Sequence, residues 1–163
     1  MTSLADLFAD KDERHRAVIL PESATEVRYG ALADQVERLA GRLRQSGLRP
    51  GQTVAIVLPN GIEFVVALLA ATRARLVAAP LNGALGVEEL RFLLESSEAG
   101  VVVTTSSASP VRDAARACNV RVWIATRTAS GDVELSGPGL SSSAADAPDG
   151  PSSGDVALLL HTS

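Results

Sequence analysis

Residues 53–58 read Thr-Val-Ala-Ile-Val-Leu, a short and almost continuous apolar run. Such a run is typical of a strand covered on both faces, as in a parallel sheet. The residues that follow predict a helix from about Ile62 to Arg75. Asn60 and Glu63 have the spacing of a capping box at its start. Together these two elements predict the beginning of a βαβ unit.

The same alternation of strands and helices continues toward the C-terminus. The further elements are strands at residues 77–79, 101–104 and 120–124, and helices that begin at Val87 and Ser109. Ser109 can cap free amides, Pro110 is tolerated in a first helical turn, and Asn119 can close this helix. The alternation predicts a doubly wound α/β fold, with a mostly parallel sheet flanked by helices.

Two elements precede the run at residue 53. Residues 17–20 and 26–29 read as short strands separated by turn residues, which predicts a small N-terminal β-hairpin. Apolar residues at helical spacing from Leu32 to Leu43 then predict an amphipathic helix. Gly47 fits the left-handed C′ position that ends such a helix.

The composition divides the chain into three segments. Residues 1–125 form the predicted α/β unit, and residues 126–154 are so rich in Gly, Ser, Pro, Ala and Asp that a flexible loop is expected. Residues 155–163 begin with Asp-Val-Ala-Leu-Leu-Leu, which predicts a buried core strand. Because this strand ends almost at Ser163, without a following helix, the pattern suggests truncation.

Bulk properties exclude several classes of protein. The net charge is −4 and no basic stripe with interleaved aromatic residues exists, so nucleic-acid binding is not expected. The start lacks the pattern of a signal peptide, and no apolar stretch reaches the roughly 20 residues of a membrane span. Cys118 is the only cysteine, which excludes an internal disulfide and fits the cytoplasm; we interpret it as a small buried hydrophobic residue.

The chain carries no recognisable catalytic motif of its own. Lys11 is the only lysine, so no Walker phosphate loop exists, and the two histidines have no nucleophile elbow or metal-ligand spacing around them. Residues 82–86, Asn-Gly-Ala-Leu-Gly, lack the third glycine of a dinucleotide fingerprint and favour an ordinary strand-to-helix turn. Three acidic residues on one predicted helix indicate a solvated face: Glu88, Glu89 and Glu95.

Several segments, in order, resemble the adenylate-forming enzymes. They are Val-Arg-Tyr-Gly-Ala-Leu at 27–32, Gly-Leu-Arg-Pro-Gly at 47–51, Val-Ala-Ile-Val-Leu-Pro-Asn at 54–60 and Ala-Pro-Leu-Asn at 79–82. Residues 155–163 look like the strand that leads into the phosphate loop T-S-G-T-T-G-x-P-K-G of this superfamily. Thr162 and Ser163 would be its first two residues. His161, which precedes them, favours a resemblance to the acyl-CoA synthetases, or AMP-dependent ligases, within this superfamily.

Two positions depart from the superfamily pattern. Arg28 and Ala31 stand where Thr and Glu often form a helix capping box. The pair Ala74-Arg75 stands where Ala-Gly is common. Both positions are structural, so the departures concern packing and leave the class unchanged.

The resemblance implies a two-step reaction for the full-length parent, in which a carboxylate reacts with ATP and the acyl-adenylate then reacts with CoA. ATP, Mg²⁺ and CoA are the implied cofactors, a carboxylate is the implied substrate, and fatty-acid metabolism is the implied setting. Thr162 and Ser163 are the implied cofactor-binding residues; no catalytic or metal-binding residue is expected within this chain, and the fragment alone is expected to be inactive.

Three hypotheses therefore remain open. The first is the N-terminal scaffold of such a ligase, and the second is a free-standing, non-catalytic α/β interaction module derived from one. The third is a dinucleotide-binding dehydrogenase domain. The sequence does not indicate which carboxylate is activated. Apolar surface left open by a truncated strand would favour a homo-oligomer.

Overall fold

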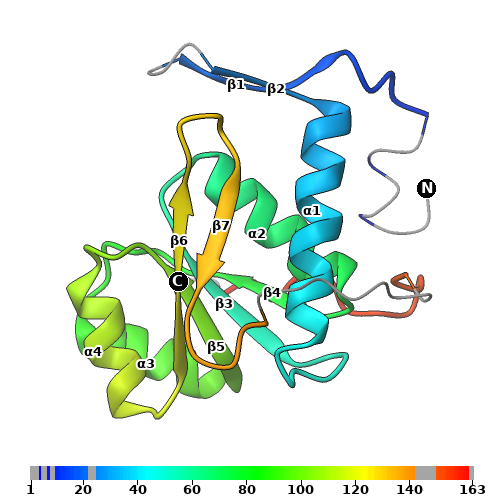
Figure 1. The fold of residues 1–163 in the computed structure, drawn as a ribbon. Helices are drawn as coiled ribbons and strands as arrows, with labels where there is room; N and C mark the ends of the chain where they lie inside the picture. The colour runs from blue at the N-terminus through cyan, green and yellow to red at the C-terminus, as the bar shows by residue number, and fades with distance from the viewer. Residues whose placement is uncertain (1–3, 5–6, 8–9, 22–24, 142–149, 162–163) are drawn as a thin grey trace.

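The computed structural model describes residues 4, 7, 10–21, 25–141 and 150–161, which form two layers of helices around one main sheet (Figure 1). In chain order the elements are β1 (Arg16–Leu20), β2 (Thr25–Arg28), α1 (Tyr29–Arg44), β3 (Thr53–Val57), α2 (Ile62–Arg73), β4 (Val77–Pro80), α3 (Val87–Ser96), β5 (Ala99–Thr104), α4 (Ser109–Ala117), β6 (Arg121–Arg127) and β7 (Val133–Ser136).

The main sheet has the strand order β4-β3-β5-β6-β7. Its first four strands are parallel, and β7 pairs antiparallel with β6. The predicted mostly parallel sheet is therefore confirmed. The expectation that residues 126–154 form a flexible loop is wrong for residues 126–127, which end β6, and for residues 133–136, which form β7.

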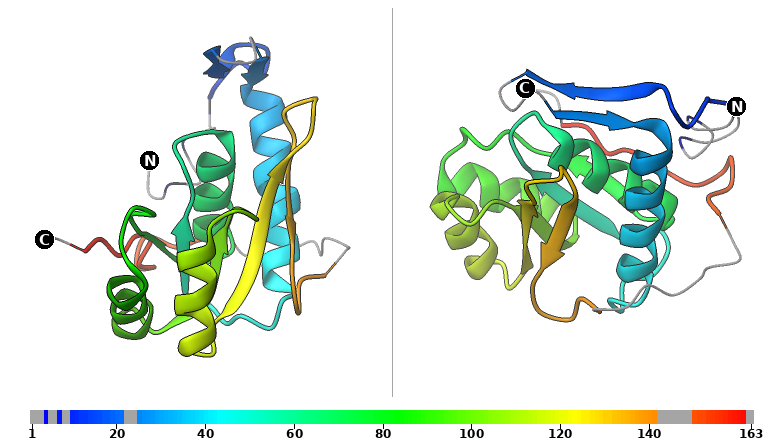
Figure 2. Two further views of the ribbon diagram at one scale, coloured as in Figure 1. Left: turned by 90° about the vertical axis from the view of Figure 1, so that its left-hand side faces the viewer. Right: turned by 45° about the horizontal axis from the view of Figure 1, so that its top comes forward.

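Different helices cover the two faces of the sheet (Figure 2). Val54 and Ile56 pack with α1 and α2, whereas Ala55 and Val57 pack with α3 and α4. Successive strand residues point to opposite faces, so a strand with helices on both sides must be apolar at every position. This explains the run that begins at residue 53: its first five residues form β3 and all five are buried, which confirms the doubly wound arrangement.

Helix α1 has the predicted amphipathic character. Its apolar stripe is buried from Leu32 to Leu43, and the helix packs along α2. Gly47 adopts the expected left-handed conformation, with φ +81°. The helix cap is Gln45, so Gly47 lies one residue beyond the predicted C′ position.

The starts of two helices differ from the predictions. Gly61, not Asn60, is the N-cap of α2, and no side chain caps it. Glu63 instead approaches Arg127, with 3.8 Å between Oε1 and Nε. Ala108 is the N-cap of α4, so Ser109 lies inside the first turn. Pro110 and the left-handed Asn119 are placed at the start and end of this helix as predicted.

The N-terminal hairpin is confirmed. Strands β1 and β2 pair antiparallel and form a sheet of their own beyond the N-terminal end of α1 (Figure 1). Leu20 and Val27 join the core beneath it. The hairpin therefore covers one end of the α1–α2 layer, while the opposite face and the edge at β4 lie apart from it.

Candidate functional site

The described chain finishes with a segment that runs beside β4. The Ala78 N–H donates to the Ala157 carbonyl and the Leu159 N–H donates to the Ala78 carbonyl, both at 2.9 Å. These bonds make a single parallel bridge between Ala78 and Leu158. We name residues 155–161 the terminal segment.

The terminal segment is not the buried strand that its composition predicts. Alternate side chains face solvent: Val156, Leu158 and Leu160 are 63%, 40% and 67% exposed. The segment lies outside β4, at the edge of the sheet, so only one of its sides has a neighbouring strand among the described residues. Apolar composition alone cannot distinguish this edge position from a central one.

A bidentate ion pair holds the start of the terminal segment. Arg75 Nε and a terminal guanidinium nitrogen donate to the two Asp155 carboxylate oxygens, at 2.9 and 3.2 Å. The Ser152 N–H also donates to Asp155, at 2.9 Å. These donors, Arg75 foremost, lower the pKa of Asp155 to about 2. The carboxylate is therefore ionised throughout the physiological range.

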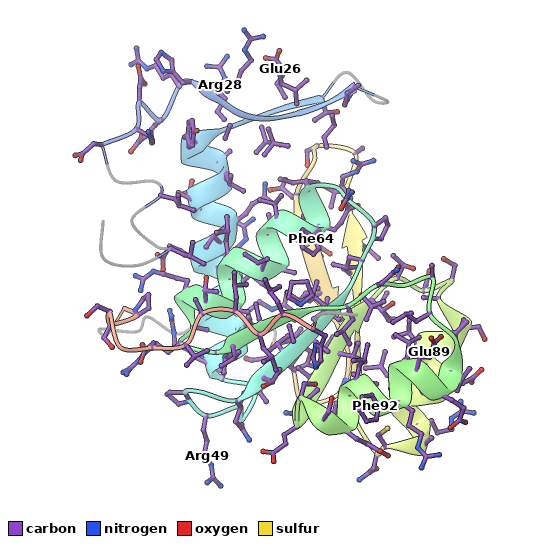
Figure 3. All side chains as sticks on the ribbon, turned by 180° about the vertical axis from the view of Figure 1, so that it is seen from behind. Glu26, Arg28, Arg49, Phe64, Glu89 and Phe92 are labelled. Atoms are coloured by element: carbon purple, nitrogen blue, oxygen red, sulfur yellow. The ribbon has the colours of Figure 1, made fainter. Side chains whose placement is uncertain are left out.

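The other end of the terminal segment reaches a groove along α3. Figure 3 shows Glu89 and Phe92 on this helix, and the 67% exposure of Phe92 makes the groove largely apolar. Its volume is about 650 Å³. The lining residues are Pro80, Leu81, Asn82, Leu85, Glu88, Glu89, Phe92, Leu93 and His161.

A second hollow, of about 630 Å³, shares Pro80, Leu81 and Asn82 with the groove. It lies over the carboxyl ends of β3 and β4 and beside the turns that lead into α2 and α4. These two helices leave the neighbouring strands β3 and β5 toward opposite faces. In open α/β sheets this is the switch point at which ligands bind. The candidate site therefore lies at the carboxyl end of the sheet, which the terminal segment also approaches at His161.

The described side chains at this edge provide shape and little reactive chemistry. Glu89 Oε2 accepts the Gly86 N–H at 2.9 Å, so this exposed acid also caps α3. Asn82 Oδ1 accepts the Ala84 N–H at 2.9 Å and closes the turn before the helix, as expected for an ordinary strand-to-helix connection. No Arg or Lys is among the described residues that line the groove.

The remaining nucleophile and metal-ligand candidates do not gather at the site. Cys118 is half-buried beside α3, and burial foremost, then the nearby Glu95, raises the pKa of its thiol. A raised pKa opposes nucleophilic chemistry. His15 approaches Asp12 near the hairpin, at 3.6 Å. Within the described ranges, no three metal-ligating side chains cluster and no helix could span a membrane.

The two predicted cofactor-binding residues, Thr162 and Ser163, lie outside the described residues. The structure shows where the chain is at His161, immediately before them. That position lies beside the carboxyl ends of the parallel strands, where ligands bind in open α/β sheets.

Comparison with known proteins identifies the fold and its family. The sequence profile of a family described as "AMP-binding enzyme" matches residues 6–163. The chain belongs to this AMP-binding family. It is similar to an oxalate–CoA ligase of Arabidopsis thaliana, with 38% identity over 141 residues, 83% of this chain and 27% of that protein.

Other similar proteins are also CoA ligases or acyl-CoA synthetases by name. A long-chain-fatty-acid–CoA ligase of Mycobacterium tuberculosis is 34% identical over 112 residues, which cover 64% of this chain and 22% of the ligase. A solved Mycobacterium tuberculosis fatty acyl CoA synthetase matches 99% of this chain and 33% of its own length, with 27% identity and a TM-score of 0.79. The chain thus spans about a third or less of the length of these relatives.

One functional candidate, the pair of Arg75 and Asp155, was not predicted from the sequence. Arg75 stands where the AMP-binding resemblance leads one to expect Gly, and its backbone is indeed left-handed, with φ +63°. An arginine at a position that favours Gly is the signal that could have indicated an acidic partner for its side chain. Its partner lies 80 residues away, so sequence spacing could not identify it.

Proposed function

We propose that this chain is the N-terminal scaffold of an ATP-dependent acid–thiol ligase. The observation that carries the proposal is the terminal segment, which is bonded to β4 at Ala78 and reaches the groove at His161. Membership of the AMP-binding family, with a span of 27% of the oxalate–CoA ligase, supports it. Residues that follow Ser163 would complete the phosphate loop at this edge.

The proposed reaction activates a carboxylate in two steps. A carboxylate oxygen attacks the α-phosphorus of ATP, and pyrophosphate leaves; the sulfur of CoA then attacks the acyl carbon, and AMP leaves. A free carboxylate is a poor acyl donor, whereas AMP is a good leaving group. Preorganised amides, cations and Mg²⁺ would offset the phosphate charge in the first step.

Within this reaction the described residues act as a support. Their groove is apolar with two acids, so by itself it does not fit a triphosphate, and they form no three-residue metal cluster. We assign ATP, Mg²⁺ and CoA to a site completed by residues outside the described ranges. Thr162 and Ser163 would contribute the first hydroxyls of the loop, and a cytoplasmic location would supply both nucleotide and CoA.

The direct test incubates the polypeptide that continues past Ser163 with ATP, CoA and a panel of aromatic, dicarboxylic and fatty acids. The proposal expects acyl-CoA and AMP in equal amounts with at least one acid. ADP as the nucleotide product, or turnover that does not depend on a carboxylate, would contradict it.

The alternative is a non-catalytic interaction module. The described groove supports this alternative, because it is largely apolar and no Arg or Lys is among the described residues that line it. The codons after Ser163 separate the two proposals, because Gly-Thr-Thr-Gly continues a phosphate loop and a stop codon ends the chain. NAD(H) binding detected by calorimetry would revive a dinucleotide-binding domain.

A further inference from the structure

We propose that Arg75 is a positioning residue whose ion pair with Asp155 fixes the register of the terminal segment against β4. The register determines where His161 and the following residues lie at the carboxyl edge of the sheet. The link from register to phosphate-loop position rests on the proposed function, whereas the register itself is a property of this chain.

The backbone of Arg75 gives no reason for an arginine. Its φ of +63° is left-handed, a conformation that favours Gly. The Arg75 N–H donates to the Thr72 carbonyl at 3.0 Å, and the Arg75 carbonyl accepts the Gly51 N–H at 2.8 Å. Glycine would make both bonds without strain. The reason for arginine must therefore lie in its side chain.

The Arg75 side chain makes a directional contact. Its guanidinium binds both carboxylate oxygens of Asp155, and the two side chains are only 34% and 24% exposed. A bidentate arginine–carboxylate pair constrains both distance and orientation. Asp155 is fixed further by the Ser152 N–H. The pair therefore joins the end of the α2–β4 connection to the first residue of the terminal segment.

The ion pair has the same register as the strand pairing. Arg75 and Asp155 are 80 residues apart, and so are the bridged residues Ala78 and Leu158. The rest of the segment, Val-Ala-Leu-Leu-Leu, is uniformly apolar, and its backbone bonds to Ala78 would form equally well in shifted registers. Weakly patterned strands are prone to such slips. Asp155 is the only charged residue from 150 to 160, so this pair is what distinguishes one register from the others.

A slip would have a functional cost. Moving the terminal segment by one residue displaces its end by about 3.3 Å, and a reacting group displaced by about 1 Å can already lose much of its rate. The pair thus sets the starting position of the proposed phosphate loop.

The test measures amide hydrogen exchange in the 163-residue chain by NMR. Arg75→Gly removes the guanidinium and relieves the left-handed strain, whereas Asp155→Asn keeps the shape of the partner and removes its charge. Both should accelerate exchange of the Leu159 amide by about tenfold or more, because its bond to Ala78 opens more often. The thermal midpoint of Arg75→Gly should change little, because relief of the left-handed strain offsets the lost ion pair, and this separates positioning from general stabilisation.

Two further variants control the experiment. Arg38→Gln breaks another arginine–aspartate pair, a single and more exposed contact with Asp132 at 3.4 Å that lies outside the terminal segment, and should leave Leu159 exchange unchanged. The double variant Arg75→Asp with Asp155→Arg restores a pair of opposite charges, because Asp tolerates left-handed backbone, and should recover most of the protection. Leu159 exchange within about twofold of wild type in both single variants would overturn the proposal.

A second readout uses the polypeptide that extends past Ser163. There Arg75→Gly should lower kcat for carboxylate-dependent pyrophosphate exchange by about tenfold, with the KM for the carboxylate little changed. An unchanged kcat would overturn the functional link. If the wild-type polypeptide shows no exchange at all, the proposed function fails, while the hydrogen-exchange result still decides the register.

Discussion

Trp123 is the largest fully buried side chain, and a segment rich in glycine covers it. Its indole N–H donates to the Pro138 carbonyl at 2.9 Å, and the Arg121 guanidinium lies 5.6 Å from the ring centroid. A Cβ at Gly137 would lie 2.4 Å from Trp123 Cδ1. The close approach of this backbone to the indole therefore requires glycine at position 137.

Replacement of Gly137 by alanine should destabilise the fold by about 3 kcal/mol, because the added methyl group clashes with Trp123 and the backbone φ of +157° also disfavours a side chain. Gly47→Ala is the matched control. Its φ is +81° but nothing lies within 4 Å of the new Cβ, so it should cost only about 1 kcal/mol. Urea unfolding monitored by Trp123 fluorescence measures both, and equal losses would contradict the packing argument.

The ionisation of Asp155 gives a pH prediction. Its folded pKa is about 2, below the roughly 3.9 of an unfolded chain, so its contribution to stability is complete above about pH 4 and is lost as the pH falls toward 2. A carboxyl ¹³C titration should give a midpoint near 2, and Arg75→Gln should raise it toward the ordinary value. A wild-type midpoint near 4 would argue against the ion pair.

At the scale of elements, the N-terminus of α1 lacks a side-chain cap. Arg28 is its N-cap and makes no side-chain capping bond, and no acidic residue stands in the first turn. The absent capping box was anticipated from the residues at positions 28 and 31. The Tyr29 and Gly30 amides instead donate to the His15 and Glu13 carbonyls, both at 3.0 Å, and the helix is held by its buried stripe against α2.

Restoring the box with Arg28→Thr and Ala31→Glu should stabilise the protein by about 1 kcal/mol, because the new hydroxyl and carboxylate can accept the backbone amides of residues 31 and 28. For a domain of this size, that corresponds to a rise of about 3 °C in the thermal midpoint. Ala31→Glu alone, which adds only a charge near the helix dipole, should give a smaller rise. No rise in the double variant would contradict the prediction and would show that these amides already have partners.

Local sequence predicts the elements of this fold better than their ends. The run at β3 and the stripe of α1 follow from burial on two faces or one, which the pattern of apolar residues records directly. The caps of α2 and α4 were misplaced by one residue, because Asn60 and Ser109 have the right chemistry but the chain turns elsewhere. Strand β7 was missed because its order depends on pairing with β6 and on contacts from α1, such as Gln35 with the Val133 amide at 2.9 Å.

At the scale of the whole molecule, the C-terminal side exposes a row of apolar side chains. Val156, Leu158 and Leu160 are exposed along the terminal segment, and Phe92 is exposed on α3. Exposed apolar surface of this kind is typical of an interaction site. We expect the 163-residue chain to self-associate through this row.

Sedimentation velocity should accordingly show a weight-average mass that rises with concentration. Val156→Thr with Leu160→Thr should reduce this rise, because the row loses two of its apolar side chains. The matched control is Ile19→Thr, since Ile19 is 57% exposed on the hairpin and lies away from the row. A clean monomer at high concentration, or an equal effect of the control, would contradict the prediction.

The candidate site was only partly predictable. The strand-to-helix turn at residues 82–86 follows from the alternation of elements, whereas the segment at residues 155–161 was expected near the site only from the resemblance to the adenylate-forming enzymes. The edge position of that segment and its ion pair could not be predicted, because both depend on which strand the chain returns to after residue 154. Return to β4 is a choice of topology, and the local sequence on either side contains no record of it.

Carboxylate-dependent exchange of labelled pyrophosphate into ATP tests the central claim most directly. We expect exchange by the polypeptide that continues past Ser163 with at least one carboxylate, and none above background by the 163 residues alone. Exchange by the 163-residue chain, or its absence from the longer polypeptide with every carboxylate class, would contradict it.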